Sequence, residues 1–345
     1  MKSQTINHQS RTTNHESRTP NPQPPTPKLL SVKDFSLNFV LRKSTCYAVN
    51  GISFDISEGE TLGIVGESGA GKSVTCYSLL GLLPKNSVNS GEAIYKNKNL
   101  LTLSDKELNK VRGKDISIIF QDPMTSLNPF LRIGKQIIEP LVTHCKVNRK
   151  QAKEEAVKIL KEVGIKNPEQ RFYQFPHEFS GGMRQRIMIA MALITKPKLL
   201  IADEPTTALD VTIQAKILKL LKNLKISHSM GIIFITHDLG VVAQICDSVC
   251  VLYAGKIMEK GSVNDIFYNS MHPYTIALKR SIPSLEEEQA TLYSIPGLPP
   301  DLSKEIKGCP FAPRCERAEK ECFEIEEVCL KEVENGHFSS CIKYY

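Results

Sequence analysis

One loop, residues 66–73, constrains the fold of this chain more than any other segment. It reads Gly-Glu-Ser-Gly-Ala-Gly-Lys-Ser and matches the pattern G-x-x-x-x-G-K-S. The apolar run Thr61–Val65 predicts a strand before it, and the residues from Gly71 to about Leu83 predict a helix after it. Glycines in this context let the backbone curl, so that its N–H groups and the helix N-terminus face one anion. The loop therefore predicts a site for the phosphates of a nucleotide.

Side chains within this loop and after a later strand are expected to complete the site. Lys72 is placed to reach the β- and γ-phosphates, and the Ser73 hydroxyl is placed to ligate Mg²⁺. Asp203 and Glu204 directly follow an apolar strand, at the sheet edge where ligands bind in parallel α/β folds. We expect Asp203 to hold Mg²⁺ through water. Glu204 is expected to accept a proton from the attacking water or to orient it.

Two weaker candidates follow other apolar strands. His237 comes after the run 231–235 and is placed to reach a γ-phosphate. Gln121 comes after the run 115–120 and is placed to sense Mg²⁺ or water. Neither carries weight alone, because a single polar residue after a strand is commonly structural. Their value lies in joining the other groups at the same edge of the sheet.

Apolar strands alternate with helices through most of the chain. Besides the elements around the loop, strands are expected at 30–32, 52–54, 115–120, 199–202, 231–235 and 248–253, and helices at 150–163, 211–226 and 239–245. This alternation predicts an α/β fold with a parallel sheet covered on both faces. Between residues 122 and 180 helical signals dominate, which predicts a helical subdomain.

Composition excludes several classes of protein. The chain has 345 residues, and its longest apolar stretches, such as Ile187–Ile194, are far shorter than a membrane helix needs. We therefore expect a cytosolic protein without a secretory signal. The net charge of +7 comes partly from the N-terminal residues and does not predict a nucleic-acid partner. Residues 1–28 are rich in Asn, Gln, Ser, Thr and Pro, which predicts a disordered arm.

Half of the ten cysteines lie in the segment 309–345, after a proline-marked linker. Because a reducing cytosol disfavours disulfides, such a cluster points first to metal binding. The candidate ligands are Cys309, Cys315, Cys322 and Cys341. Their spacing fits neither a zinc knuckle nor a ferredoxin run, so an iron–sulfur cluster, zinc and a metal-free tail all remain open. Cys329 is expected to stay outside the set, and His337 is either a ligand or a neighbour.

The segment Phe179–Gln185, Phe-Ser-Gly-Gly-Met-Arg-Gln, resembles the signature motif of ATP-binding-cassette (ABC) ATPases, usually Leu-Ser-Gly-Gly-Gln. The order of the motifs matches that family through residues 30–260. The resemblance implies a P-loop NTPase of the ABC type, with a RecA-like core, an antiparallel β-subdomain and a helical subdomain over about 122–180. A second anion-binding helix start makes sense when two cassettes face head to tail around two ATP molecules.

The resemblance also implies roles for individual residues. Phe39 stacks on adenine, with Tyr47 as a weaker alternative, and Asp210 lies in a loop that crosses the dimer interface. The implied catalytic residues are Glu204, His237 and Gln121, and the implied Mg²⁺ ligands are Ser73, Gln121 and Asp203. The implied nucleotide contacts are Phe39, Gly66, Glu67, Ser68, Gly69, Ala70, Gly71, Lys72, Ser73, Val74, Gln121, Ser180, Gly181, Gly182, Asp210 and His237.

The segment departs from the usual signature at two points. Phe179 replaces Leu, which is a mild apolar change, and Met183-Arg184 precede the usual Gln. The resulting Ser-Gly-Gly-Met-Arg-Gln-Arg resembles the oligopeptide/dipeptide permease branch. The segments 121–129, 271–275 and 308–315 resemble it too. The branch implies an ATPase domain over 29–265 and a C-terminal extension over 266–345. It also implies a [4Fe–4S] cluster at Cys309, Cys315, Cys322 and Cys341.

This branch further implies an ATP-hydrolysing subunit of an importer of di- and oligopeptides, peripheral on the cytoplasmic face of the inner membrane. Its partners would be a second, homologous ATPase subunit in a heterodimer, two transmembrane permease subunits and a solute-binding protein. The alternatives are import of another small solute such as a nickel complex, a soluble ABC ATPase without a transport role, and an iron–sulfur regulatory ATPase.

Overall fold

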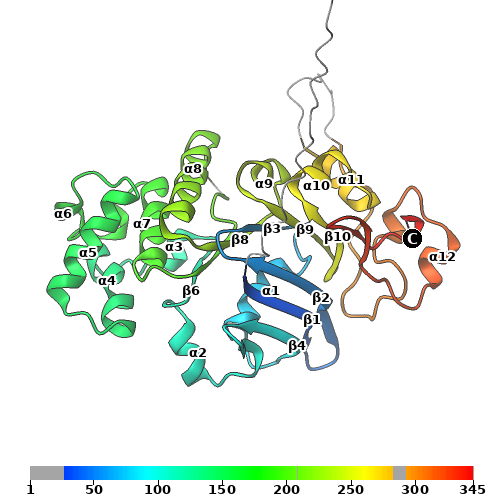
Figure 1. Cartoon of the computed structure of the whole chain (residues 1–345), viewed down its shortest axis with the longest axis horizontal. Helices are drawn as coiled ribbons and strands as arrows, with labels where there is room; N and C mark the ends of the chain where they lie inside the picture. Colours follow the sequence, from blue (N-terminus) through cyan, green and yellow to red (C-terminus); the bar gives the residue numbers. More distant parts are fainter. Residues whose placement is uncertain (1–26, 208, 283–292, 345) are drawn as a thin grey trace, which may run out of the picture.

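Figure 1 shows the chain as a computed structural model, in which a central sheet joins a helical part at one end to the C-terminal part at the other. The structure describes residues 27–207, 209–282 and 293–344. The arm expected to be disordered, residues 1–28, falls almost wholly outside the described residues. Lys28 already lies in the first strand, one residue before the expected start of the folded part.

The central sheet has the strand order β11-β12-β10-β9-β3-β8-β7-β6. Its parallel strands are β3 (Thr61–Val65), β6 (Ile116–Ile119), β7 (Leu199–Asp203), β8 (Gly231–Thr236) and β9 (Ser248–Tyr253). The antiparallel strands at one edge are β10 (Lys256–Ser262), β11 (Lys331–Glu334) and β12 (His337–Ser339). The expected parallel sheet is thus confirmed for its centre, and the whole sheet is mixed.

Alternate residues of the parallel strands enter two separate cores, which explains their continuous apolar sequence. In β8, Ile232 and Phe234 pack on one face with residues of the helices that follow the strands, whereas Ile233 and Ile235 pack on the other face against α1 and a second sheet. The covering helices are α1 (Lys72–Leu79), α7 (Gly181–Leu193), α8 (Val211–His228) and α9 (Leu239–Ile245). Packing on both faces of the sheet therefore holds the carboxyl ends of these strands in place.

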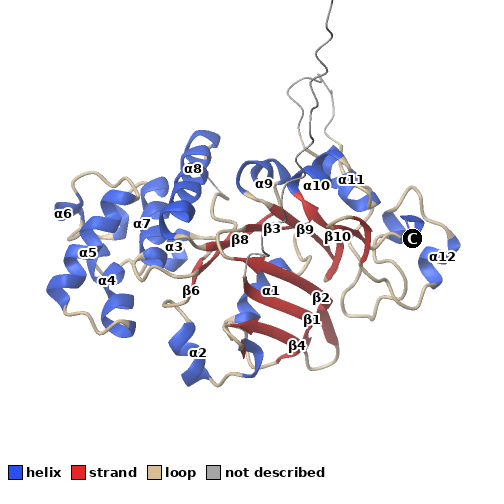
Figure 2. Ribbon diagram, in the orientation of Figure 1, coloured by secondary structure: helices blue, strands red, loops and turns tan. Residues whose placement is uncertain are grey.

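The second sheet is antiparallel, as the resemblance implies, and lies below the central sheet in Figure 2. Its strands are β1 (Lys28–Val40), β2 (Thr45–Ser57), β4 (Ser87–Tyr95) and β5 (Lys98–Asn99). The sequence does not predict β4, because its Asn-, Ser- and Gly-rich residues are mostly exposed and indicate only the end of a helix. Helix α1 also ends earlier than expected, near Gly81 with its φ of 59°.

The segment 122–180 is helical, as expected. It contains α3 (Pro123–Ser126), α4 (Ile133–His144), α5 (Arg149–Glu162) and α6 (Pro168–Arg171), and α7 follows it. In α5 the spacing of Ala152, Ala156 and Leu160 puts all three on the buried face. The Asn148 side chain accepts a hydrogen bond from the Gln151 N–H and caps the helix. Local pattern and capping together fix this helix.

The C-terminal part adds strands to the central sheet. Strand β12 pairs with β10 through Glu259–Ser339 and Lys260–Phe338. The remaining helices are α2 (Asp105–Val111), α10 (Val263–Tyr268), α11 (Pro273–Arg280) and α12 (Lys320–Glu324), with 3-10 turns at Leu100–Thr102, Pro176–Glu178, Ala312–Arg314 and Ile342–Tyr344. Within the described residues, no helix combines the length and apolarity needed to span a membrane.

Candidate nucleotide-binding site

The glycines of the phosphate loop are required by its backbone. Gly66, Gly69 and Gly71 have φ values of 155°, 80° and 97°, in the region that side chains disfavour. A Cβ atom on Gly66 would lie 2.1 Å from the Leu252 carbonyl oxygen. A Cβ atom on Gly71 would lie 2.7 Å from the Ala48 carbonyl oxygen. The loop therefore packs against neighbouring backbone in a conformation that only glycine tolerates.

Lys72, the first residue of α1, lies over this loop. Its Nζ donates hydrogen bonds to the carbonyl oxygens of Gly66 at 2.7 Å and Glu67 at 3.0 Å. The residue is buried, and burial lowers the pKa of the ammonium group, while Glu204, Asp203 and Glu67 oppose that shift. The cation is thus held beside the backbone that is expected to cradle the phosphates, and its contact with the phosphates stays a prediction.

Two hydroxyl groups of α1 donate hydrogen bonds to the carboxylate of Asp203 at the end of β7. The Ser73 hydroxyl donates to Asp203 Oδ1 at 2.8 Å, and the Tyr77 hydroxyl donates to Oδ2 at 2.5 Å. Burial raises the pKa of Asp203, and these two hydrogen bonds oppose the shift. Hard oxygen ligands of this kind suit Mg²⁺. Sequence reasoning did not single out Tyr77, although its spacing of one helical turn from Ser73 puts both on one face of α1.

Glu204 is the centre of a second cluster at the strand ends. Its Oε2 accepts hydrogen bonds from Gln121 Nε2 at 3.1 Å and from the Thr207 hydroxyl at 2.9 Å. Its Oε1 lies 3.3 Å from His237 Nδ1. The φ of Glu204 is 45°, a conformation that is rare outside glycine and is found preferentially at functional sites. The structure therefore brings together Gln121, Glu204 and His237, and adds Thr207, which no local pattern distinguished.

The signature segment, Phe179–Gln185, lies apart from the phosphate loop, at the start of α7. Ser180 is the N-cap residue of α7, and a Cβ atom on Gly182 would lie 2.9 Å from Ile213 of α8. In Figure 1, α7 belongs to the helical part and α1 lies beneath the central sheet. Asp210 caps α8 by accepting a hydrogen bond from the Ile213 N–H at 2.9 Å. The signature and the phosphate loop thus belong to separate parts of the chain.

The candidate adenine-stacking residue lies on the second sheet. Phe39 is half-buried on β1 and packs partly against the core beneath it. Tyr47, on β2, opposes Asn38, the neighbour of Phe39. The Tyr47 N–H donates to the Leu302 carbonyl oxygen at 2.9 Å, so its backbone is tied to the C-terminal part. Adenine stacking by Phe39, with Tyr47 as the weaker alternative, stays a prediction.

The cysteines at the C-terminal end surround one small cavity, to which Cys309, Cys315, Cys322 and Cys341 all contribute. Burial raises the pKa of Cys309 to about 11, and the charges of Cys315 and Cys322 add to that shift. The thiols are therefore near one another. In the described part of the chain, however, no three His, Cys, Asp or Glu side chains stand in a metal-binding arrangement.

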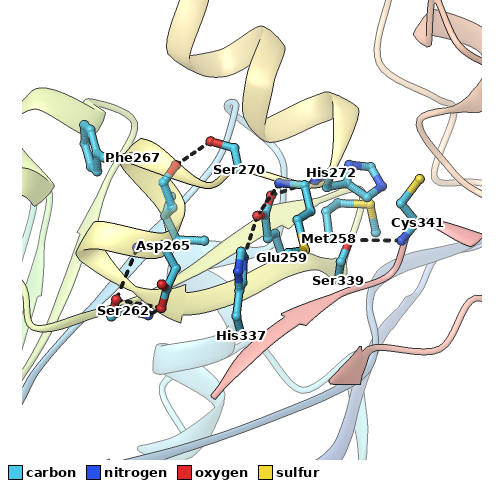
Figure 3. A network of polar contacts seen from close by, with 12 residues as sticks. Met258, Glu259, Ser262, Asp265, Phe267, Ser270, His272, His337, Ser339 and Cys341 are labelled. Carbon is cyan, nitrogen blue, oxygen red and sulfur yellow. Dashed lines mark hydrogen bonds and ion pairs between the residues drawn. The ribbon is translucent and has the colours of Figure 1, made fainter. Parts of the chain in front are cut away.

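His337 lies against Glu259 and not in this cavity. Its Nε2 is 2.8 Å from Glu259 Oε1, and both side chains are buried. Figure 3 shows the imidazole beneath Glu259, while the Cys341 sulfur points away from it. Glu259 also accepts hydrogen bonds from the N–H groups of Met271 and His272. His337 thus joins β12 to β10 and is a neighbour of the cysteines.

The fold and the site define a P-loop ATPase of the ABC class. Residues 49–207 match the family "ABC transporter", and residues 258–322 match "Oligopeptide/dipeptide transporter, C-terminal region". The chain is 50% identical to the oligopeptide transport ATP-binding protein OppD of Escherichia coli (strain K12), over 91% of this chain and 93% of that one. It is 55% identical to the dipeptide transport ATP-binding protein DppD of Bacillus subtilis (strain 168), over 84% and 87% of the two chains. The chain therefore belongs to the ATP-binding proteins of oligopeptide and dipeptide ABC transporters.

A solved structure supports the fold of the ATPase part. An ATP-binding cassette solved as a dimer in a post-hydrolysis state, bound to ADP and Pi, has a TM-score of 0.61 and 27% sequence identity. The match covers 68% of this chain and 98% of that one. Roughly the remaining third of the chain thus lies outside that cassette.

Proposed function

We propose that this chain is the ATP-hydrolysing subunit of an importer that takes up di- and oligopeptides. The observation that carries the proposal is the Glu204 carboxylate, held by Gln121, Thr207 and His237 at the strand ends beside the phosphate loop. The names of its relatives, which describe oligopeptide and dipeptide transport, support the solute class. Reconstitution in vesicles with the second ATPase subunit, the permease subunits and the solute-binding protein tests it, because peptide should then stimulate ATP turnover, and no response to peptide would contradict it.

The residues divide the chemistry between them. The backbone N–H groups of the loop and Lys72 bind the phosphates, and Ser73 with Asp203 offers oxygen ligands to Mg²⁺, which supplies neutralisation of phosphate charge. Glu204 orients the attacking water and accepts its proton. His237 and Gln121 hold the Glu204 carboxylate in place. Phe39 stacks on the adenine.

A second cassette completes the site in this proposal. Ser180, Gly181 and Gly182 start a helix whose first N–H groups form an anion site, and it serves the nucleotide of the partner. Asp210 lies at the same interface. The related cassette was solved as a dimer, which supports the pairing of two cassettes. The partner is a homologous ATPase chain, which makes the pair a heterodimer.

The permease subunits dock in a groove beside β6. The groove has a volume of about 270 Å³ and is lined mainly by apolar side chains, among them Leu82, Phe120 and Met191. Leu82 and Phe120 are 43% and 39% exposed, which is high for large apolar residues. Phe120 directly precedes Gln121, so a helix of a permease subunit in this groove would lie next to a Glu204 contact. The chain is then peripheral on the cytoplasmic face of the membrane.

Leu82→Glu should lower co-purification of the permease subunits at least about tenfold, because it places a carboxylate in an apolar contact. The measurement is pull-down of the complex in mild detergent. Ile226→Glu is the matched control, since Ile226 is 70% exposed and lies on α8, away from the groove. Equal recovery of the permease subunits with both variants would remove the groove from this role.

The C-terminal thiols are proposed to hold a [4Fe–4S] cluster through Cys309, Cys315, Cys322 and Cys341. All four cysteines line one cavity, and thiolates suit iron–sulfur clusters as well as zinc. Because no three of these side chains stand in a metal-binding arrangement among the described residues, binding of the cluster requires the thiols to move closer together. Protein purified without oxygen should be brown, with broad visible absorbance that Cys315→Ser abolishes. Cys329→Ser should retain the absorbance, because Cys329 does not line the cavity. A colourless preparation with stoichiometric zinc, or with no metal, contradicts the cluster.

The runner-up proposals make different predictions. An importer of a nickel complex would respond to that complex and not to peptide in the vesicle assay. A regulatory iron–sulfur ATPase would hydrolyse ATP without any transport partner and would respond to redox state. Recovery of permease subunits with the chain from membranes favours the importer over both a regulatory and a soluble ATPase.

A further inference from the structure

Glu67, the second residue of the phosphate loop, contacts the C-terminal part at two independent points. Its carboxylate forms an ion pair with Arg314, at 2.8 Å between Oε2 and Nη1. Its N–H donates a hydrogen bond to the Tyr274 hydroxyl at 2.9 Å. Its carbonyl oxygen accepts the hydrogen bond from Lys72. One residue therefore joins the phosphate-binding lysine to a segment more than two hundred positions away.

The guanidinium of Arg314 is fixed on several sides. It donates hydrogen bonds to the carbonyl oxygens of Pro296 at 2.9 Å and Ile295 at 3.1 Å, and to the Tyr253 hydroxyl at 3.1 Å. Its side chain is only 6% exposed. Contact with Glu67 and Tyr253 raises the pKa of Arg314 against the effect of burial. A planar group held this way positions its carboxylate partner well, because few other rotamers are open to it.

Arg314 comes from the loop that carries the first two clustered cysteines. That loop reads Cys309-Pro-Phe-Ala-Pro-Arg-Cys315, so Arg314 directly precedes Cys315. Phe311 of the same loop is 2% exposed and contacts the rings of Tyr253 and Tyr274, with centroid distances of 5.4 Å and 5.3 Å. The ring contacts place the loop against β9 and α11, and the ion pair joins it to Glu67 of the phosphate loop.

These contacts do not belong to the catalytic chemistry. Arg314 and Tyr274 bond to the side chain and the N–H of Glu67, whereas Lys72 bonds to its carbonyl oxygen. The Glu204 cluster involves neither Arg314 nor Tyr274. Their connection to the phosphate-binding groups therefore runs through the backbone and side chain of Glu67.

We propose that Arg314 and Tyr274 are positioning residues for the phosphate loop, through which the C-terminal cysteine loop sets the affinity of the chain for ATP. The proposal rests on the ATPase function proposed above. A phosphate loop that loses its contact with Arg314 or Tyr274 keeps its N–H groups and Lys72, but these groups occupy a wider range of positions. The binding of ATP in the ground state therefore weakens. The catalytic cluster is not displaced, and kcat is preserved.

Steady-state ATP hydrolysis by the full chain, in its complex, tests this with Arg314→Gln, Glu67→Gln and the double variant. Arg314→Gln should raise KM for ATP by about three- to tenfold, because only part of the free energy of one charged hydrogen bond is passed on to the placement of the loop, with kcat changed less than about twofold. The KM of the double variant should equal that of Arg314→Gln, because the two substitutions break the same ion pair between Glu67 and Arg314. Arg280→Gln is the matched control, because it removes the same charge from an exposed ion pair. Arg280 is 54% exposed, and its Nη1 lies 4.0 Å from Glu316 rather than near Glu67.

An unchanged KM in Arg314→Gln, or single effects that multiply in the double variant, would overturn the proposal. So would a fall in kcat with KM unchanged. Should Arg314→Gln fail to fold, Tyr274→Phe removes one hydroxyl only and should still raise KM severalfold, because it leaves the Glu67 N–H without its partner. The ATPase proposal fails separately, since it predicts turnover by the unaltered chain.

Discussion

Glu204→Gln is expected to lower kcat for ATP hydrolysis at least about a hundredfold, while ATP stays bound. The amide has the shape of the carboxylate and can still accept the hydrogen bonds from Gln121 and Thr207. It cannot accept a proton from water. The phosphate loop, Lys72 and Ser73 are untouched, so binding energy for the nucleotide is retained. The loss therefore falls on the chemical step.

The measurement is phosphate release together with the amount of labelled ATP that remains on the protein after gel filtration. Glu155→Gln is a suitable control, because this glutamate is 41% exposed on α5 and pairs with Lys158. Full turnover in Glu204→Gln would take the proton-accepting role away from Glu204 and leave it a structural residue at the strand end.

Lys72→Ala is expected to raise the dissociation constant for ATP by about a hundredfold or more, since it removes the buried cation that is proposed to bind the phosphates. The loss is of binding itself, which separates this variant from Glu204→Gln. Titration with a fluorescent ATP analogue measures it. Lys158→Ala, at a 70% exposed position, is the control. A normal dissociation constant combined with lost turnover would show that Lys72 acts only in the transition state.

The sequence predicts the parallel core well because each of its strands is a continuous apolar run flanked by turn residues. Strands β7, β8 and β9 and helix α9 lie within a residue or so of their expected bounds. Strands β4 and β12 could not be predicted in the same way. Their residues are polar or few, and what makes them strands is pairing with distant partners.

The candidate site shows the same division. The sequence singles out Lys72 because it belongs to the G-x-x-x-x-G-K-S pattern. It singles out Asp203, Glu204 and His237 because each lies at the end of an apolar strand. Tyr77 and Thr207 could not, because each is one polar residue among many until the fold brings it to a carboxylate. The ion pair between Glu67 and Arg314 spans most of the chain, and no local pattern connects its two members.

The edge of the central sheet has a consequence for the order in which the chain folds during synthesis. Strand β10 emerges from the ribosome well before β12, which pairs with it through Glu259–Ser339 and Lys260–Phe338. Until then its outer backbone groups are unpaired, and the buried Glu259 lacks its contact with His337. An unpaired edge strand is a template for association with other chains. Nascent or truncated chains that stop before residue 337 should therefore be the form that depends on chaperones.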